Sequence, residues 1–223
     1  MGNTEIITIS GLTKSYGTHL LWSDIELQVG AGEMLAVRGV SGSGKSTLLH
    51  CIGLLEQPDS GSVKLLGVEA SSSSSRAKRM MRQSVIGYLF QDYALVESCS
   101  VQENIDIAAR PRLWMKRINV EDVLKKVGLE GRSADPVHTL SGGEQQRVAL
   151  ARLLVKPSRI IVADEPTAAL DEANEAMVMG MLRELADGGR AVIVATHSDT
   201  VADHCDRIFT IPELEPVPLR RPK

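Results

Sequence analysis

Residues 39–46 have the types and the spacing of a loop that binds phosphate. Glycine stands at the first and sixth positions of this stretch, and Lys45 and Ser46 close it. Glycine lets backbone N–H groups turn towards a phosphate at the start of a helix, where the helix dipole also favours an anion. Lys45 would supply a charge for the β- and γ-phosphates, and the hydroxyl of Ser46 could bind Mg²⁺. The predicted cofactor-binding residues of this loop are Gly39, Val40, Ser41, Gly42, Ser43, Gly44, Lys45, Ser46 and Thr47.

A pair of carboxylates follows a short apolar run later in the chain. Asp164 and Glu165 come directly after residues 160–163, which read Ile-Ile-Val-Ala. The carboxyl ends of parallel strands are where such sheets bind ligands. Asp164 could therefore hold Mg²⁺, directly or through water, and Glu165 could orient and polarise a water that attacks the γ-phosphorus. Taken alone, an apolar run before Asp-Glu is equally compatible with an ordinary turn at a strand end.

Residues 140–147 contain a second glycine-rich anion site. Ser141, Gly142 and Gly143 precede a predicted helix over residues 144–155, so their N–H groups and the Ser141 hydroxyl lie at a helix N-terminus. The octapeptide Leu-Ser-Gly-Gly-Glu-Gln-Gln-Arg should arise by chance on the order of once in 10^10 positions, which excludes coincidence. It resembles the signature motif of ATP-binding cassette (ABC) ATPases. In that family the motif completes the nucleotide site of a partner subunit, which implies that this chain works as a dimer.

The same resemblance gives roles to residues that follow predicted strands. Residues 160–165 look like the Walker B motif of the family. Gln91 resembles the Q-loop glutamine, whose amide oxygen could bind Mg²⁺ or the attacking water, and His197 resembles the H-loop histidine, which can donate to the γ-phosphate. Outside this context, a Gln or a His at a strand end is normally structural. The implied catalytic residues are Glu165, His197, Gln91 and Lys45, and the implied Mg²⁺ ligands are Ser46, Gln91 and Asp164.

Two further positions match the family's pattern for the nucleotide and the dimer interface. Tyr16 matches the A-loop aromatic, which offers its ring face to adenine, whereas nearby Trp22 stands among apolar residues and is expected to pack in the core. Asp171 belongs to the D-loop, which lies across the subunit interface in the family. The family more often has Ser or Gly where this chain has Ala168, so the resemblance does not imply the finer contacts of this loop.

The hydrophobic pattern predicts an α/β fold that positions these residues. Alternation at residues 5–10 and 25–29 predicts an antiparallel β region, and residues 34–38 predict a buried strand that runs into the phosphate loop. Helical and strand patterns then alternate from residue 144 to residue 195, which indicates a mainly parallel sheet. The remaining predicted elements are helices over residues 46–55, 76–83, 120–127, 144–155 and 172–186 and strands over residues 85–90, 159–163 and 191–195.

The expected fold class is a P-loop NTPase (RecA-like) core with a mainly parallel sheet, an N-terminal antiparallel β region and a helical subdomain insert. The resemblance implies a single ABC ATPase domain over residues 1–223. Five serines at residues 71–75 are expected to form a solvated connector before a basic helix. The domain would be divided into a catalytic core over residues 1–91 and 139–211, a helical subdomain over 92–138, and a proline-rich extended tail over 212–223.

Composition excludes several classes of partner and site. With 25 basic and 28 acidic side chains the formal net charge is −3, and no basic run indicates a nucleic-acid partner. Apolar runs last four or five residues, whereas a membrane-spanning helix needs about twenty, so the chain is not expected to cross a bilayer alone. The N-terminus lacks the pattern of a secretory signal, which favours the cytosol. Cys51, Cys99 and Cys205 are far apart without zinc spacing and are expected to be reduced thiols.

The resemblance covers residues 4–211 and implies an ATP-binding and ATP-hydrolysing subunit of an ABC transporter. Two copies would close head to tail around two ATP–Mg²⁺ and drive a separate integral-membrane permease from the cytoplasmic side of the membrane. Residues 53–56, 87–91 and 140–147 are most similar to the macrolide-export, lipoprotein-release and haem-export group. Export of a small molecule, haem, peptide or lipoprotein is therefore predicted.

Two alternative functions stay open. A mechanical or signalling ATPase of the cell-division type, which acts on a membrane partner without moving a solute, would have nearly the same sequence. A nucleotide-binding module without turnover is disfavoured because Glu165 and His197 are both present. The residues from Gln91 to about Asp106, including Tyr93, Leu95 and Glu103, are candidates for docking the membrane partner. The apolar residues of this docking segment could equally be part of the core.

Overall fold

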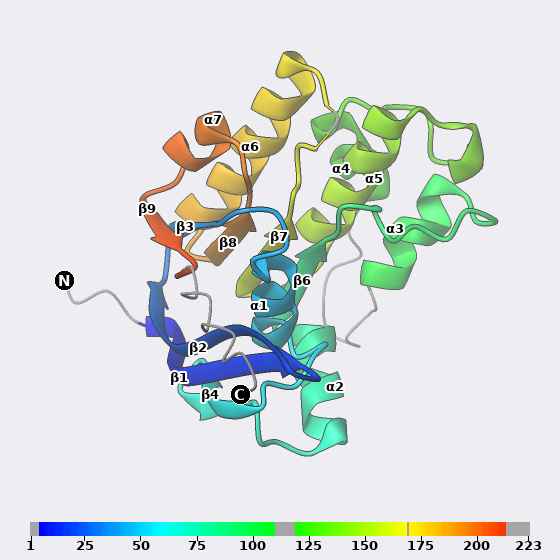
Figure 1. Ribbon diagram of the computed structural model, residues 1–223. Helices are drawn as coiled ribbons and strands as arrows, with labels where there is room; N and C mark the ends of the chain where they lie inside the picture. Colours follow the sequence, from blue (N-terminus) through cyan, green and yellow to red (C-terminus); the bar gives the residue numbers. More distant parts are fainter. Residues whose placement is uncertain (1–4, 110–118, 169, 213–223) are drawn as a thin grey trace, which may run out of the picture.

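The computed structural model describes residues 5–109, 119–168 and 170–212. Its backbone forms two sheets with a helix between them, and further helices cover the far face of the larger sheet (Figure 1). No helix within these residues is long and apolar enough to span a bilayer. The predicted tail lies outside the described residues from position 213 onwards, and so does Ala169 of the predicted D-loop.

A four-stranded antiparallel sheet begins the chain. Its β1–β2 pair slips in register at several points, for example between Ile9 and Leu12, as it does at β-bulges. The predicted antiparallel region is confirmed, and its strands are longer than predicted because the bulges interrupt the alternation of apolar and polar residues. In spatial order the strands are β2 (His19–Gly30), β1 (Glu5–Tyr16), β4 (Ser60–Leu65) and β5 (Val68–Glu69).

A five-stranded sheet forms the centre of the molecule, and all of its neighbouring strands are parallel. Every residue of β8 is buried, as expected for a short Val/Ile/Ala strand that is covered on both faces. The predicted parallel sheet is confirmed. Its edge strand β9 was not predicted, because its side chains are mostly exposed and carry no apolar run. In spatial order the strands are β6 (Ile86–Leu89), β7 (Ile160–Asp164), β8 (Ala191–Ala195), β3 (Met34–Arg38) and β9 (Arg207–Thr210).

Two hydrophobic cores lie on the two faces of this parallel sheet. The first joins the antiparallel sheet to α1 (Lys45–Ile52), which follows the phosphate loop. The second joins α5 (Gly142–Val155) and α6 (Glu172–Asp187) to the sheet. Successive residues of β7 alternate between them, with Ile160 in the first core and Ile161 in the second. The carboxyl end of β7 is therefore held from both sides.

The segment between β6 and α5 is helical, as predicted, within the part of it that the structure describes. It contains α3 (Val101–Ala109), α4 (Val120–Lys126) and a 3₁₀ turn over Val137–Thr139. α3 packs against α5, and Ser100 forms an isolated antiparallel bridge with Pro136. Residues 110–118 lie outside the described residues. The division of the chain into a core and a helical subdomain stays a prediction.

The serine run forms a largely exposed loop before a basic helix, as expected, except at its first residue. Ser71 is buried, and its hydroxyl donates to Glu69 Oε1 at 2.6 Å and accepts from the N–H of Val63 at 3.2 Å. Ser74 caps α2 (Ser75–Ser84) by accepting from a backbone N–H group. Only Ser71 departs from the expected solvated connector, because its short hydroxyl side chain is satisfied by a nearby backbone group and carboxylate.

Candidate functional site

A cavity of about 460 Å³ opens where the carboxyl ends of the parallel strands meet the start of α1. Separate parts of the chain contribute to its wall, and most residues predicted for the nucleotide site are among them. The lining residues are Tyr16, Leu21, Ser41, Gly42, Gly44, Lys45, Ser46, Thr47, Gln91, Glu165, Ala168 and His197. The predicted residues Gly39, Val40 and Ser43 belong to the same loop, which joins β3 to α1.

Glycine is required at the inner end of the phosphate loop. Gly44 has a φ of 87°, and a Cβ atom placed there would lie 2.7 Å from Nε1 of Trp22. Trp22 is fully buried, as predicted, and its Nε1 donates to the Gly44 carbonyl at 3.4 Å. Gly42 also has a positive φ of 79°, but open space surrounds the position of its missing Cβ. The indole of β2 therefore fixes the point at which the loop becomes helix.

Lys45 folds back onto its own loop. Its Nζ donates to the carbonyl of Gly39 at 3.0 Å and to that of Val40 at 3.3 Å. The hydroxyl of Ser43 is buried without a hydrogen-bond partner among the described residues, and a Cβ on Gly39 would collide with it. The loop therefore holds an ammonium group and a spare hydroxyl donor, and its first glycine leaves no room for a side chain beside that hydroxyl. These are groups that a polyphosphate can use.

The oxygen donors predicted for Mg²⁺ also come together. Ser46 Oγ donates to Asp164 Oδ1 at 3.1 Å, and Gln91 lines the same cavity. Burial raises the pKa of Asp164, and the bond from Ser46 opposes this rise. The described residues contain no group of three or more His, Cys, Asp or Glu side chains with metal-binding geometry. Mg²⁺ in phosphate sites typically takes one or two protein carboxylates and completes its shell with phosphates and water, so this sparse set of hard oxygen donors fits it.

Glu165 and His197 form a pair beside these donors. The distance from His197 Nδ1 to Glu165 Oε2 is 2.9 Å. Glu165 has a φ of 45°, which is uncommon for a residue with a side chain and points to a functional constraint. Its N–H donates to the carbonyl of Ala195 in β8. A carboxylate held in this way could orient water, and the second ring nitrogen of His197 is left to meet a phosphate.

Tyr16 lies at the mouth of the cavity, and its ring is half exposed. The ammonium group of Lys14 lies 5.1 Å from the ring centroid, which is within the range of a cation–π contact. Lys14 is itself buried and bonded to Glu56 at 2.8 Å. The ring is thus held at the end of β1 with apolar surface available for a planar base.

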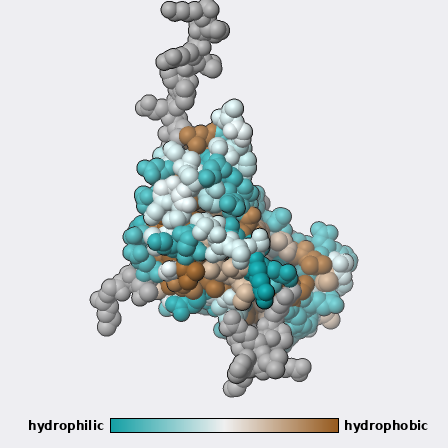
Figure 2. All heavy atoms as spheres, turned by 90° about the horizontal axis from the view of Figure 1, so that it is seen from below, coloured by the Kyte–Doolittle hydropathy of each residue, from teal (hydrophilic) through white to brown (hydrophobic). Residues whose placement is uncertain are grey.

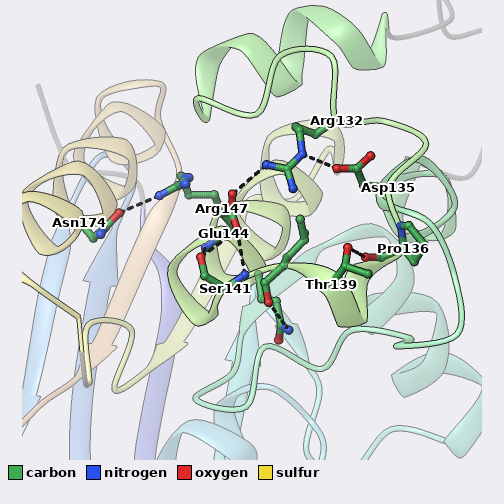
Figure 3. Close-up of polar contacts among 10 residues, drawn as sticks. Arg132, Asp135, Pro136, Thr139, Ser141, Glu144, Arg147 and Asn174 are labelled. Carbon is green, nitrogen blue, oxygen red and sulfur yellow. Dashed lines mark hydrogen bonds and ion pairs between the residues drawn. The ribbon is translucent and has the colours of Figure 1, made fainter.

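The signature residues do not reach this cavity. Ser141 is the N-cap of α5, with Gly142 exposed beside it (Figure 3). Asp171 is also absent from the cavity wall: it caps α6 by accepting from the N–H of Asn174 at 2.8 Å. The structure therefore divides the predicted site residues into one group around the phosphate loop and a second, separate group at the N-termini of α5 and α6.

Four residues near these two helix ends were given no role by the sequence: Arg132, Glu144, Arg147 and Asn174. Arg132 Nη1 donates to Glu144 Oε1 at 2.8 Å, and Arg147 Nη1 donates to Asn174 Oδ1 at 2.8 Å (Figure 3). The spacing of Ser141 and Glu144 is a capping-box pattern, so the sequence did contain a signal for that contact. No local pattern pairs Arg132 with Glu144 or Arg147 with Asn174, because these partners meet only through the packing of different segments.

The sequence of this chain matches a known protein family and several of its members. The model of the family described as ABC transporter matches residues 22–168. The macrolide export ATP-binding/permease protein MacB of Nitrosomonas europaea is 40% identical over 217 residues, which cover 92% of this chain and 32% of that protein. The pyoverdine export ATP-binding/permease protein PvdT of Pseudomonas putida is 39% identical, with 93% of this chain and 33% of that protein covered. This chain spans about a third of the length of these relatives.

Solved structures agree with the fold over nearly the whole chain. The dimeric structure of MJ0796, a bacterial ABC transporter cassette, superposes with a TM-score of 0.85 at 33% identity and covers 92% of this chain and 94% of that chain. A dimeric post-hydrolysis state of the same cassette, bound to ADP and Pi, gives a TM-score of 0.84 at 32% identity.

Proposed function

This chain belongs to the ABC transporter family as an ATPase, and we propose that two copies of it close head to tail around two ATP–Mg²⁺ and thereby drive an integral-membrane permease. The single observation that carries the proposal is the separation of the site residues. The cavity at the phosphate loop contains groups for base, phosphate, metal and water, whereas Ser141, Gly142 and Gly143 lie elsewhere. A second copy could supply these three residues to the cavity. The dimeric MJ0796 cassettes support this arrangement.

The residues around the cavity have distinct roles in this proposal. Tyr16 stacks on adenine, and the loop of residues 39–47 surrounds the phosphates. Lys45 exchanges the carbonyls of Gly39 and Val40 for phosphate oxygens. Ser46, Asp164 and Gln91 would hold Mg²⁺, which neutralises phosphate charge when bound. The role of Asp171 is to cap α6 beside the second copy. The full set of residues for which we propose nucleotide binding is Tyr16, Gly39, Val40, Ser41, Gly42, Ser43, Gly44, Lys45, Ser46, Thr47, Ser141, Gly142, Gly143 and Asp171.

Glu165 and His197 would carry out the hydrolytic step. Glu165 accepts a hydrogen bond from the attacking water and takes its proton as the water oxygen bonds to the γ-phosphorus. The bond between the γ-phosphorus and the bridging oxygen breaks in the same step, so that ADP leaves with the electron pair. His197 holds the carboxylate through Nδ1 and presents Nε2 to the γ-phosphate. Release of the phosphate removes the group that joins the two copies, and the pair reopens. Since ATP binds the closed dimer more tightly than the open one, ATP binding shifts the population towards the closed dimer, and hydrolysis shifts it back towards the open one.

The permease is proposed as a separate subunit that moves a small molecule, haem, peptide or lipoprotein outward, with this chain peripheral on the cytoplasmic side of the membrane. The export ATP-binding/permease relatives support a membrane partner and the outward direction. In the docking segment, Tyr93 and Leu95 pack against the second hydrophobic core, and Glu103 accepts hydrogen bonds from Ser100. These three residues are therefore better explained as structural than as contacts to the partner.

A basic cleft is a better candidate than these three residues for the surface that contacts the permease. Arg79, Arg82, Arg152 and Lys156 line a cleft of about 340 Å³, and no carboxylate lines it among the described residues. Burial, and then the charge of Arg152, lower the pKa of Lys156 to about 8. Lys156, Arg82 and Arg152 each donate to a backbone carbonyl group and not to a carboxylate within the described residues. We place an acidic segment of the permease in this cleft.

Apolar side chains lie close to the cleft as well. Ile107, which lines it, is 46% exposed, and Met80, next to Arg79 in α2, is 59% exposed. Figure 2 shows the face that is below in Figure 1, where hydrophobic patches alternate with strongly hydrophilic ones. A partner helix with acidic and apolar residues would match such a surface.

The dimer is tested by light scattering after size-exclusion chromatography of the Glu165→Gln chain, with and without Mg-ATP. The proposal expects an ATP-dependent shift from monomer to dimer, because bound ATP is then not hydrolysed. Lys45→Ala in the same background should stay monomeric. A chain that binds ATP yet remains a monomer would contradict head-to-tail closure. Transport is tested by reconstituting the chain with its permease: ATP-dependent solute movement supports export, whereas ATP turnover without movement supports the mechanical alternative.

A further inference from the structure

The capping box of α5 places the carboxylate of Glu144 inside the signature site, by which we mean the N-terminus of α5 with Ser141, Gly142 and Gly143. Ser141 donates to Glu144 Oε2 both from its N–H and from its hydroxyl, each at 2.8 Å. The Glu144 N–H donates back to Ser141 Oγ at 3.4 Å. The N–H groups of Gly142 and Gly143 have no acceptor within the described part of the chain. A phosphate that binds at this helix terminus therefore meets two free donors and, directly beside them, a negative charge.

That negative charge is permanent under physiological conditions. Hydrogen bonds from Ser141, and then from Arg132, lower the pKa of Glu144 to about 2. The carboxylate cannot relieve its repulsion of a phosphate by taking up a proton near neutral pH. A cation must compensate it if the site is to bind phosphate.

Arg132 supplies this cation from the segment between α4 and α5. Its Nη1 donates at 2.8 Å to Glu144 Oε1, the oxygen that Ser141 does not use. Figure 3 shows the Glu144 side chain between Arg132 and Ser141. The guanidinium also forms an ion pair with Asp135 through Nε, which fixes its direction and shares its charge between the two carboxylates. Arg147, the other arginine in this region, is directed to Asn174 instead.

We propose that Arg132 is a positioning residue of the signature site, which compensates the charge of Glu144 and holds its carboxylate away from the phosphate. The inference rests on the head-to-tail dimer proposed above. When the γ-phosphate of the second copy arrives, the Ser141 hydroxyl turns its proton from Glu144 to the phosphate. The N–H of Ser141 and the guanidinium of Arg132 keep the carboxylate in place during this exchange.

The test compares single and double variants in the Glu165→Gln background. Arg132→Ala is expected to raise the Mg-ATP concentration for half-maximal dimerisation about tenfold, as the loss of a charged hydrogen bond would. Glu144→Gln removes the charge but keeps a side chain that can complete the capping box. The double variant Arg132→Ala/Glu144→Gln should therefore dimerise within about threefold of the reference. Arg132→Gln, which keeps a long polar side chain, serves if Arg132→Ala does not fold.

The matched control is Lys125→Ala in α4, whose exposed side chain pairs only with Glu130 within the described residues. A defect in Arg132→Ala that exceeds the control and is rescued by Glu144→Gln supports the inference. A defect equal to that of the control, or one that Glu144→Gln does not rescue, overturns it and indicates a purely structural arginine. Failure of the reference chain itself to dimerise with ATP would overturn the dimer proposal instead. Binding of a fluorescent ATP analogue to the monomer should be the same in all variants, because Arg132 does not line the cavity.

Discussion

The Nδ1 atom of His197 lies 2.9 Å from Oε2 of Glu165, which joins the ends of two neighbouring parallel strands. The imidazole is largely exposed, whereas the carboxylate is mostly covered. The histidine therefore restricts the directions in which Glu165 can point, and it does so from a position on the cavity wall. Under the proposed function, substitutions in this pair should therefore reduce ATP hydrolysis more than ATP binding.

We expect Glu165→Gln to bind ATP with unchanged affinity and to lose turnover by at least about a hundredfold, the usual scale of a general base. His197→Ala should also reduce turnover, and it should weaken ATP binding by no more than about tenfold, because it removes the support of the carboxylate and one hydrogen bond to the γ-phosphate. Multiple-turnover phosphate release and equilibrium binding of a fluorescent ATP analogue measure the two quantities. Normal hydrolysis by Glu165→Gln would show that another group activates the water.

Gly42 and Gly44, the two glycines of the phosphate loop with positive φ, provide a matched comparison. Gly42→Ala should destabilise the chain by about 1 kcal/mol, since it meets only the unfavourable left-handed backbone. Gly44→Ala adds a collision with Trp22 and should cost about 2–4 kcal/mol. Urea unfolding followed by circular dichroism measures both. Equal losses would mean that Trp22 does not restrict the loop, and a partial recovery in Gly44→Ala/Trp22→Phe would identify the indole as the obstacle.

The capping box gives a defined pH dependence of stability. Because the folded pKa of Glu144 is lowered to about 2, the ionised carboxylate stabilises the fold above its unfolded pKa, and this contribution is lost as the pH falls towards 2. The difference in unfolding free energy between the original chain and Glu144→Gln should be constant above about pH 5.5 and shrink below about pH 4.5. Urea unfolding of both chains at about pH 7 and about pH 3.5 measures it. The same difference at both values would contradict the assigned contacts.

The basic cleft predicts a charge-reversal effect on the membrane partner. Arg79 lines the cleft, is exposed, and lies on α2, whereas Arg76 is exposed one turn earlier on the same helix and does not line it. Arg79→Glu should reduce co-purification with the permease at least about fivefold, because it places a carboxylate opposite the acidic segment. Arg76→Glu is the control and should have little effect. Equal behaviour of the two variants would move the docking surface elsewhere, and ATP hydrolysis by the isolated chain should be unaffected by either.

Local patterns predicted the parts of this molecule that depend on neighbouring residues. The loop before Lys45, the strand before Asp164 and the fully buried β8 all have signals within a few residues. The edge strand β9 and the five-residue helix α7 (Asp199–Asp203) lack an apolar run of sufficient length, so their form depends on tertiary contacts. The sequence likewise gave no indication of the ion pair at 2.6 Å between Arg38 and Asp199, whose partners are far apart in the chain.

The candidate site shows the same limit. The resemblance to ABC ATPases predicted Tyr16, Gln91 and His197 as site residues, and the structure brings all three to one cavity. Spacing could not show that Lys45 bonds its own loop or that Arg132 compensates Glu144, because both contacts depend on side-chain direction. Motifs in the sequence thus indicated candidate site residues, and three-dimensional packing determines how their charges are balanced.

Because the Trp22 indole donates a hydrogen bond to the Gly44 carbonyl, tryptophan fluorescence can report on the conformation of the phosphate loop. The chain has two tryptophans, so replacing Trp114 by Phe leaves Trp22 as the sole strong fluorophore. Any movement of the loop that lengthens this bond changes the polarity around the indole and with it the emission wavelength. Occupancy of the loop could then be followed in real time without an attached dye.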